Sequence, residues 1–524
     1  MRAVTAGLRA VLGVAAVAVG ATLLSGRVNV GAEVASGSPP RVSEDLPVTA
    51  MNLGGGVANN SPSIVDDPAD ARFVVMANRL DAPDFSCALQ VSGDHGRTWL
   101  PVNPVPDLPQ GAEKCYAPEV AFDRGSTLHY LFVGLQGGGN QPMGAFITTS
   151  RDRGRSWSVP RQVLGPQNFG VRMAIDRSLS NGGRIHLVWI HADSTPGAGF
   201  SPTANPIMAS HSDDGGRTFS TAVQVSDPAR RRVVAPVLAL GPNHAVNIAY
   251  YDLGDDAVDY QGLEGGVWSG TWSIVETTST DGGRSFGPAT VVDDRIVPDG
   301  RVMLIFTMPP PALVAVGDRR LCAAWTDART GDPDAMLRCS DDRRSWGVLV
   351  RLNDDPVGNG RTQYQPHLSV APNGRIDAVF YDRRGDPQDM RNDVYYTFST
   401  DGGHVFAYNR QLTSDSSSTA IGQQYTNPSA QGLVEFGSRV GLLSTDTRAV
   451  AAWTDTRNIR SGIAQDIFST IVSYPTKAGS QPAWVRAVGG ILAALGIAFM
   501  AVAARRRRPK LAPAAADANP GDGS

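Results

Sequence analysis

One eight-residue stretch recurs along the chain and constrains the fold more than any other feature. It reads Ser-Gly-Asp-His-Gly-Arg-Thr-Trp at Ser92–Trp99 and returns, in full or altered form, at five later points. The six copies start at Ser92, Ser150, Ser212, Ser279, Ser340 and Ser399, so successive starts are 58, 62, 67, 61 and 59 residues apart. Repetition at a nearly constant period predicts a repeat architecture in which each period forms one structural unit.

Each residue type in the repeated stretch has a mechanical role in a tight turn. A Ser and an Asp two residues apart can bond to the backbone of the turn. The Gly adopts a positive φ without steric cost, and the final Trp or Phe anchors the turn in the core. Four copies keep this pattern, one has Val405 at the hydroxyl position, and the copy at 340–346 is one residue short and lacks its Gly. We therefore expect structural roles for the six carboxylates, which are Asp94, Asp152, Asp214, Asp281, Asp342 and Asp401.

The repeated stretch, written Ser-x-Asp-x-Gly-x-Thr-Trp, resembles the Asp box, or bacterial neuraminidase repeat, of sialidases and other Asp-box β-propellers. The resemblance extends over residues 92–406. It implies an all-β fold of four-stranded antiparallel blades, with each box at the turn between the third and fourth strands. It also implies that the boxes lie on the face of the propeller away from the active site.

A second recurring pattern lies upstream of the boxes and predicts the first two strands of each blade. A Pro stands 14 residues before a bulky residue in four repeats, namely Pro62 and Met76, Pro236 and Tyr250, Pro311 and Trp325, and Pro366 and Phe380. Two strand-like runs joined by a turn lie within each of these intervals. Each repeat therefore supplies a first and a second strand, a variable connection, a third strand that enters the box, and a fourth strand.

A seventh unit follows the last box. Residues 439–443 and 449–457 repeat the first two strands and 465–472 supply a third, but neither a box nor a fourth strand follows. The stretch Leu46–Asn52 precedes the first repeat and can supply the missing strand. Closing the ring in this way removes the exposed edges of an open sheet. We predict a seven-bladed β-propeller over residues 42–475, with six blades, the number found in sialidases, as the alternative.

The N-terminal segment carries an export signal. Arg2 and Arg9 precede the apolar run Ala10–Leu24, and small residues and prolines follow. This order is typical of a secretory signal peptide, and an uncleaved N-terminal anchor is the alternative. We assign residues 1–36 to this segment.

The C-terminal segment carries a membrane-spanning signal. Ala487–Ala504 is a run of eighteen uncharged residues, with Trp484 before it and four arginines at 505–508 after it. Such a run is long enough to span a bilayer, and the arginine block is typical of the cytoplasmic side. We expect a transmembrane helix at 484–504, a basic and disordered cytoplasmic tail at 505–524, and a propeller held outside the cell membrane.

The four cysteines suit an exported protein, because disulfides persist outside the cytoplasm. Cys322 and Cys339 fall on consecutive predicted strands of one repeat, and Cys87 and Cys115 are close in sequence. We predict the pairs 322–339 and 87–115 among three possible connectivities. The net charge of −3 gives no case for nucleic-acid binding, and the eight scattered histidines show no metal-ligand spacing. We expect no metal or other cofactor, although oxygen ligands of the kind described next would be compatible with calcium.

An Asp-x-Arg motif ends the second predicted strand of three successive repeats. Its copies are Asp327 with Arg329, Asp382 with Arg384, and Asp455 with Arg457, and a further Asp starts each third strand at Asp334, Asp393 and Asp466. If Cys322 faces Cys339, the same register places Asp327 opposite Asp334. Two facing carboxylates repel unless a cation lies between them, and Arg329 is placed to do so. The motif is either a clamp that fixes the hairpin or a rim that binds a charged or hydroxylated ligand.

Two arginines at the start of first strands are candidates for a central ligand-binding site. Arg172 and Arg439 stand where other repeats have Pro, and two guanidinium groups can grip a carboxylate. Sialidases are similar in gripping the sugar carboxylate with three arginines from different blades. A sialidase-like site would also need a Tyr nucleophile paired with a Glu, and an Asp acid, and the candidate catalytic residues are Tyr364, Tyr425 and Glu435.

The chain departs from the sialidase pattern before the first box, where sialidases carry Arg-Ile-Pro. Arg79-Leu-Asp81 lies in that region but matches the motif poorly, and Arg295-Ile-Val-Pro298 lies in a later repeat. Three functions follow as hypotheses. The first is a membrane-anchored propeller that binds a glycan or other extracellular ligand. The second is an exo-α-sialidase-like glycoside hydrolase, with carboxylates beside the glycosidic bond. The third is a propeller that binds proteins in an envelope assembly.

Overall fold

The described part of the chain is a ring of small antiparallel sheets. The computed structural model describes residues 39–49, 56–138, 140–178, 183–192, 205–256, 269–298, 309–418, 421, 436–457 and 465–475. Within them, Pro40–Ser473 belong to one compact unit. The helical content of these residues is a single 3-10 turn, η2 (Pro242–His244). The predicted signal segment, transmembrane helix and tail lie outside the described residues, and no helix within them is long and apolar enough to cross a bilayer.

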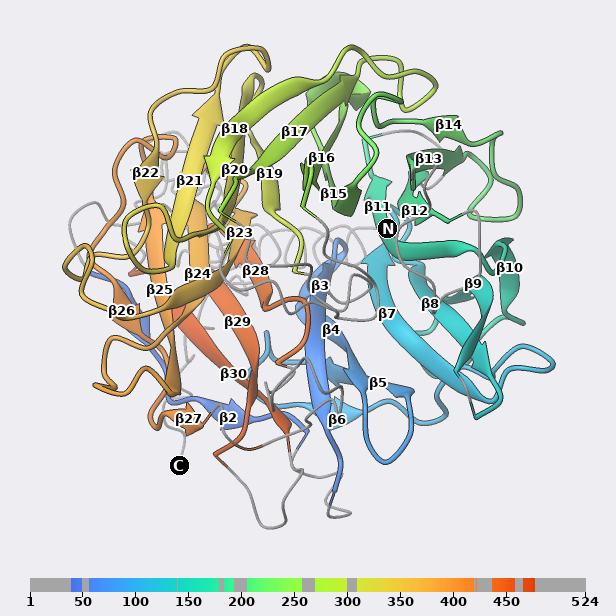
Figure 1. Cartoon of the computed structure of the whole chain (residues 1–524). Helices are drawn as coiled ribbons and strands as arrows, with labels where there is room; N and C mark the ends of the chain where they lie inside the picture. Colours follow the sequence, from blue (N-terminus) through green and yellow to red (C-terminus); the bar gives the residue numbers. More distant parts are fainter. Residues whose placement is uncertain are drawn as a thin grey trace, which may run out of the picture. The chain divides into compact units, whose positions relative to one another are not determined.

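Seven sheets form the ring, and they are called blades I to VII here (Figure 1). Blade I holds β3 (Asn59–Asp67), β4 (Asp70–Leu80), β5 (Ser86–Ser92) and β6 (Leu100–Pro101). Blade II holds β7 (Lys114–Phe122), β8 (Leu128–Gln136), β9 (Gln141–Ser150) and β10 (Arg161–Leu164). Blade III holds β11 (Asn168–Asp176), β12 (Arg184–His191), β13 (Ile207–Ser212) and β14 (Val223–Gln224). Blade IV holds β15 (Val233–Leu240), β16 (Val246–Asp252), β17 (Trp272–Ser279) and β18 (Thr290–Ile296).

The remaining three blades follow the same order. Blade V holds β19 (Ala312–Val316), β20 (Arg320–Asp327), β21 (Asp334–Ser340) and β22 (Val350–Arg351). Blade VI holds β23 (Gln363–Val370), β24 (Ile376–Asp382), β25 (Arg391–Ser399) and β26 (Arg410–Gln411), and β27 (Ser417–Ser418) also pairs with β25. Blade VII holds β28 (Gly441–Thr445), β29 (Arg448–Asp455) and β30 (Asp466–Ser473). The prediction of seven antiparallel blades is therefore confirmed.

The missing strand of blade VII comes from the N-terminal side of the propeller, as predicted. β1 (Arg41–Val42) and β2 (Leu46–Pro47) both pair antiparallel with β30. Arg41 lies opposite Ser473, and Leu46 lies opposite Ser469. The two ends of the propeller sequence therefore share one sheet, and the ring is closed by backbone hydrogen bonds.

The recurring Pro marks a bulge at the start of the innermost strands, which stand around the middle of the ring in Figure 1. The pairing register shifts there in five blades, and the residue at the shift has a positive φ. These residues are Ser61, Ala117, Gly170, Ala235 and Gln365. In four of the five blades the next residue is Pro. A bulge leaves one residue outside the ladder, so a Pro without an N–H can be placed there.

The repeated turns have the geometry that their residue types predict. In blade III the Ser212 hydroxyl donates to Asp214 Oδ1 (2.8 Å) and accepts from the Gly216 amide (2.9 Å). The Thr218 hydroxyl donates to Asp214 Oδ2 at 2.6 Å. Blades I, II and IV repeat these bonds. In blade II, hydrogen bonds from Ser156 and Ser150 lower the pKa of Asp152 to about 2. Each of the six carboxylates accepts hydrogen bonds within its own turn.

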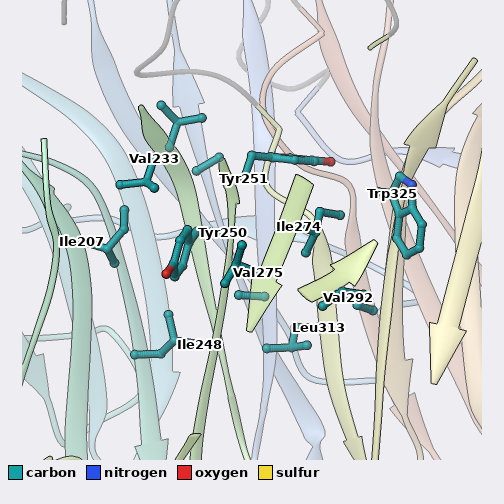
Figure 2. Close-up of a cluster of buried hydrophobic side chains, with 14 of the residues drawn as sticks. Ile207, Val233, Ile248, Tyr250, Tyr251, Ile274, Val275, Val292, Leu313 and Trp325 are labelled. Carbon is teal, nitrogen blue, oxygen red and sulfur yellow. The ribbon is translucent and has the colours of Figure 1, made fainter. Parts of the chain in front are cut away.

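The core lies between neighbouring blades, because each sheet buries both faces against the next sheet. Figure 2 shows one such region, where Ile207 and Val233 approach Ile248 and Tyr250. The same cluster extends through Val275 and Val292 to Trp325 of blade V. The glycine of each turn packs against the preceding blade. At Gly216 a Cβ atom would lie 3.3 Å from Ile147, so no side chain fits there without a shift.

Both predicted disulfides are present. Cys322 pairs with Cys339 across β20 and β21 of blade V. Cys87 of β5 pairs with Cys115 of β7 and so joins blades I and II. The first disulfide connects two strands that are already hydrogen-bonded, whereas the second adds a covalent connection between blades.

Candidate functional site

The three Asp-x-Arg motifs form clamps between blades. In blade V, Asp327 is buried and accepts from the Arg329 side chain (2.7 Å) and from the Trp325 indole N–H (3.0 Å). The other end of Arg329 reaches blade IV, where it donates to Asp293 Oδ1 at 2.7 Å. A buried carboxylate is costly unless it is paired. Arg329 pairs with both acids, and Asp293 is also paired with Arg338 at 3.0 Å.

The clamp corrects one prediction from the sequence. Asp327 does lie opposite Asp334 in the ladder. However, Arg329 does not lie between the two carboxylates. Asp334 instead accepts from Arg351 (2.7 Å) and Asn353 (2.6 Å). The terminal nitrogens of Arg329 instead bond to Asp293 of the preceding blade, because the loop after β20 turns toward β18.

Blades VI and VII repeat this arrangement with different outer partners. Arg384 donates to Asp382 (2.9 Å) and to Asp354 (2.5 Å), which follows the last strand of blade V. Arg457 is paired with Asp455 and with Asp45, which lies between β1 and β2, both at 2.7 Å. All three motif carboxylates are buried. The geometry therefore favours bracing over ligand binding for these six residues.

A second charged cluster lies at the innermost strands and contains both arginines proposed from the sequence. Arg172 of β11 donates through Nη1 to Glu119 Oε1 of β7 at 2.9 Å. Arg439, just before β28, donates through Nη1 to the same oxygen at 2.6 Å. The Met173 amide donates to Glu119 Oε2 at 2.7 Å. Three blades thus meet at one carboxylate.

The two arginines differ in how much of their bonding capacity is used. Arg439 is buried and also donates to the backbone carbonyls of Ser61 and Pro118. Arg172 has 16% of its side chain exposed, and among the described residues the guanidinium bonds only to Glu119. Burial lowers the pKa of Arg439 to about 10, with nearby Arg172 and Arg79 adding to the effect and Glu119 opposing it. Arg172 therefore keeps donors for a ligand, while Arg439 holds the carboxylate in place.

Two further residues approach this cluster. Burial, together with the neighbouring Arg439 and Arg172, lowers the pKa of His367, on β23, to about 4. His367 is therefore neutral at pH 7. Arg79 is paired with Asp81 (2.5 Å), donates to the Tyr116 hydroxyl (2.8 Å) and lies over its ring. The pair Arg79–Asp81 carries no net charge, so the cluster of Arg172, Arg439 and Glu119 holds one excess positive charge, from two cations and one anion.

The ladder register corrects the positions that the sequence gave to the arginines. His367 is the first residue paired after the bulge in blade VI, directly after Pro366. By the same register Arg172 is directly after the Pro position, which Val171 fills. Arg439 is directly before it, since Gly441 pairs first and Val440 precedes Gly441. The two arginines therefore reach Glu119 from different positions along their innermost strands, Arg172 from after the Pro position and Arg439 from before it.

The candidate catalytic residues are only partly described. Tyr364 of β23 stacks on Tyr381, with ring centroids 5.1 Å apart, and lies under the Arg383 guanidinium. Tyr425 and Glu435 lie outside the described residues. In the part of the chain that is described, no three His, Cys, Asp or Glu side chains gather in a way that could hold a metal ion.

Sequence reasoning missed Glu119 and His367. One signal could have found them, because both directly follow a recurring Pro, at Pro118 and Pro366. The equivalent residues in blades I, IV and V are Ser63, Val237 and Ala312. Glu119 and His367 stand out because these three blades have small or apolar residues at the position, whereas blade III has Arg172 there.

Fold and site together define the class of protein as a seven-bladed β-propeller with a charged cluster at its inner strands. No family model and no curated protein matches the chain. Solved propellers that it is similar to include a protein of unknown function from Dyadobacter fermentans, with 14% identity, 83% of this chain and 100% of that chain covered, and a TM-score of 0.44. A Hadza microbial sialidase shares 14% identity, with 77% and 74% covered and a TM-score of 0.42. An ulvan lyase of a polysaccharide lyase family shares 12% identity, with 84% and 94% covered and a TM-score of 0.43. Likenesses at this distance do not define an activity for the chain.

Proposed function

We propose that this protein is an exported, membrane-anchored propeller of the Asp-box type that binds an acidic carbohydrate or similar extracellular anion at its inner strands. The observation that carries the proposal is the state of Arg172. Its Nη1 bonds to Glu119, and its remaining donors have no partner among the described residues. A partly exposed guanidinium in a cluster with one excess positive charge favours a ligand with a carboxylate or sulfate group.

The environment of Arg172 supports binding by a fixed geometry. Glu119 is held by the Met173 amide and by Arg439, so it orients Arg172 without neutralising the cluster. His367 is neutral and can donate or accept a hydrogen bond at the same level. Preorganised donors reduce the entropic cost of binding. The two disulfides support the exported location, since such bonds persist in oxidising compartments.

The binding proposal is tested on the full-length chain in detergent against an array of sialylated, uronate-containing, sulfated and neutral glycans. We expect acidic glycans to be retained and Arg172→Ala to weaken their binding about tenfold or more, because a charge-assisted hydrogen bond contributes about 1.5–3 kcal/mol. The matched control is Arg155→Ala, which removes an exposed arginine from the turn of blade II. Equal retention of neutral glycans, or an Arg172→Ala variant that binds normally, would contradict the proposal.

The hydrolase hypothesis is tested in the same samples with fluorogenic glycosides that include a sialoside. Turnover that Arg172→Ala abolishes would make the protein a hydrolase rather than a binding module.

The anchored topology is tested separately by adding protease to intact cells. We expect the propeller to be cleaved and an epitope after residue 524 to be protected, and the opposite pattern would overturn the predicted orientation.

A further inference from the structure

The boundary between blades IV and V contains a carboxyl group where other blades have core residues. Glu276 of β17 is the third residue before the turn serine, and it is only 1% exposed. The same position holds Leu89, Ile147, Ala209, Leu337 and Tyr396 in other blades that carry the turn. Within blade IV, Glu276 accepts only from the hydroxyls of Thr278 (2.7 Å) and Thr290 (3.4 Å). A buried carboxyl with so few donors is costly when it is ionised.

The neighbouring blade presents two buried donors that have no acceptor among the described residues. They are Nε of Arg343 and Nε1 of Trp346, both in the shortened turn of blade V. Arg343 is the one positive-φ residue of this turn (φ 56°), where the other copies have two. Its side chain extends to blade IV, since a Cβ atom on Gly241 would lie 3.3 Å from Arg343 Nη2. The turn of blade V is one residue shorter than the others. Where the other turns pack a glycine against the preceding blade, this turn therefore places the side chain of Arg343.

The repeat shows which group these donors would meet. In blade I the equivalent Trp99 donates its indole N–H to Ser469 Oγ of blade VII at 3.0 Å. Ser469 pairs with Ala452 in the ladder, as Glu276 pairs with Ala249, so the two residues occupy equivalent positions. The acceptor that corresponds to Ser469 for Trp346 is therefore Glu276. Ser469 is always neutral, whereas Glu276 can change its charge.

We propose that Glu276, Arg343 and Trp346 form a proton-operated contact between blades IV and V. When Glu276 is ionised, it accepts from the Trp346 indole and attracts the Arg343 guanidinium, and the turn of blade V is drawn against blade IV. When Glu276 takes up a proton, the attraction to Arg343 is lost and the turn is released. The groups that face Glu276 are Thr278 and Thr290 from its own blade and Arg343 from the next.

The direction of titration supports a switch in the range of extracellular pH. Burial raises the pKa of Glu276 to about 7, and Arg343, Thr278 and Thr290 partly oppose this rise. Removal of the cation should therefore raise the pKa further. The equivalent contact between Trp99 and Ser469 contains no titratable group, so its charge does not change with pH.

The experiment measures Trp346 fluorescence in the full-length protein between pH 5 and pH 9. The chain has nine tryptophans, so the Trp346 component is the difference between the wild type and Trp346→Phe. We expect this component to change with a midpoint near pH 7 and to lose the transition in Glu276→Gln, which keeps the size of the side chain. The difference between the wild type and Trp99→Phe serves as the matched control and should stay constant over this range.

Arg343→Gln gives an independent measurement in case one variant folds poorly. Because the cation lowers the pKa of Glu276, its removal should move the midpoint of the Trp346 transition to higher pH. A Trp346 component that does not change with pH would overturn the proposal. A transition that persists in Glu276→Gln, or a midpoint that Arg343→Gln leaves in place, would also overturn it.

Discussion

Arg329 and Asp293 form an ion pair across the boundary between blades V and IV, with Arg329 Nη2 at 2.7 Å from Asp293 Oδ1. The same arginine also holds Asp327 of its own blade. Both acids have side chains that are at most 1% exposed. One guanidinium therefore contacts two buried carboxylates, of which Asp293 is also paired with Arg338 at 3.0 Å. The planar fork of an arginine suits this double role better than an ammonium group would.

Loss of this arginine should destabilise the propeller strongly. We expect Arg329→Ala to lower the free energy of unfolding by about 3–5 kcal/mol, the usual effect of removing one partner of a buried ion pair. The measurement is chemical denaturation monitored by circular dichroism. Arg72→Ala is the matched control, because Arg72 pairs with Asp70 at the surface and should contribute about 0–1 kcal/mol. Equal effects of the two substitutions would contradict the clamp.

Removal of the charge on Glu119 should separate stability from binding. In Glu119→Gln, two arginines lose a shared anion, so we expect the free energy of unfolding to fall by about 2 kcal/mol or more. The net charge of the cluster rises from one to two, so binding of an acidic glycan should become tighter. Calorimetric unfolding and titration check the two effects. Glu113→Gln, at an exposed position of the same blade, should change neither quantity.

His186 should make the protein sensitive to acid. Burial, together with nearby His211 and Arg184, lowers the pKa of His186 to about 4, while Asp176 and Asp213 partly oppose this shift. The unfolded chain binds this proton near pH 6.5, so stability is complete above that pH and falls as the pH drops toward 4. The loss amounts to about 3 kcal/mol, at about 1.4 kcal/mol for each unit of pKa.

The check for His186 is the slope of stability against pH. We expect His186→Val to show a shallower loss between pH 6.5 and pH 4 than the wild type. Val75 and Val450 occupy the equivalent ladder position in blades I and VII, so a valine is tolerated at this point of the fold. An unchanged slope would show that other groups cause the acid sensitivity.

The turn of blade VI lacks one hydrogen bond that can be restored. Val405 is 67% exposed, and Asp401 receives no hydroxyl bond of the kind that Thr218 donates to Asp214 in blade III. We expect Val405→Thr to raise the free energy of unfolding by about 0.5–1.5 kcal/mol, the net contribution of one such bond. The reverse change, Thr218→Val, should lower it by a similar amount. Thermal unfolding of the two variants measures both changes in the free energy of unfolding. Two changes of the same sign would contradict this account.

The architecture could be predicted from the sequence because the repeat reports it many times. Six copies of the turn and four copies of the Pro spacing give the period, and the partial seventh unit gives the blade count. The cysteine pairing followed from the same alignment of strands, and both disulfides confirm it. Local rules were enough wherever a contact lies within one repeat.

The site could be predicted only in part, because its contacts cross between repeats. Arg172 and Arg439 were identified, but their common partner Glu119 is separated from Arg439 by 320 residues. The outer partner of Arg329 was assigned to its own hairpin, whereas Asp293 belongs to the preceding blade. Spacing along the chain does not show which side chains of adjacent blades meet. That information comes only from the packing of one sheet on the next.

The closure of blade VII has a consequence for the order in which the protein is made. Ser43 and Thr470 are hydrogen-bonded although 427 residues separate them. A chain that is synthesised from its N-terminus must keep residues 41–47 unpaired until the last strand, β30, has followed. During that time the segment is an unsatisfied strand, and the third strand of blade VII in a neighbouring copy would accept it equally well. Synthesis of this protein at a high local concentration should therefore yield linked pairs of rings, in which each ring is completed by the first strands of the other.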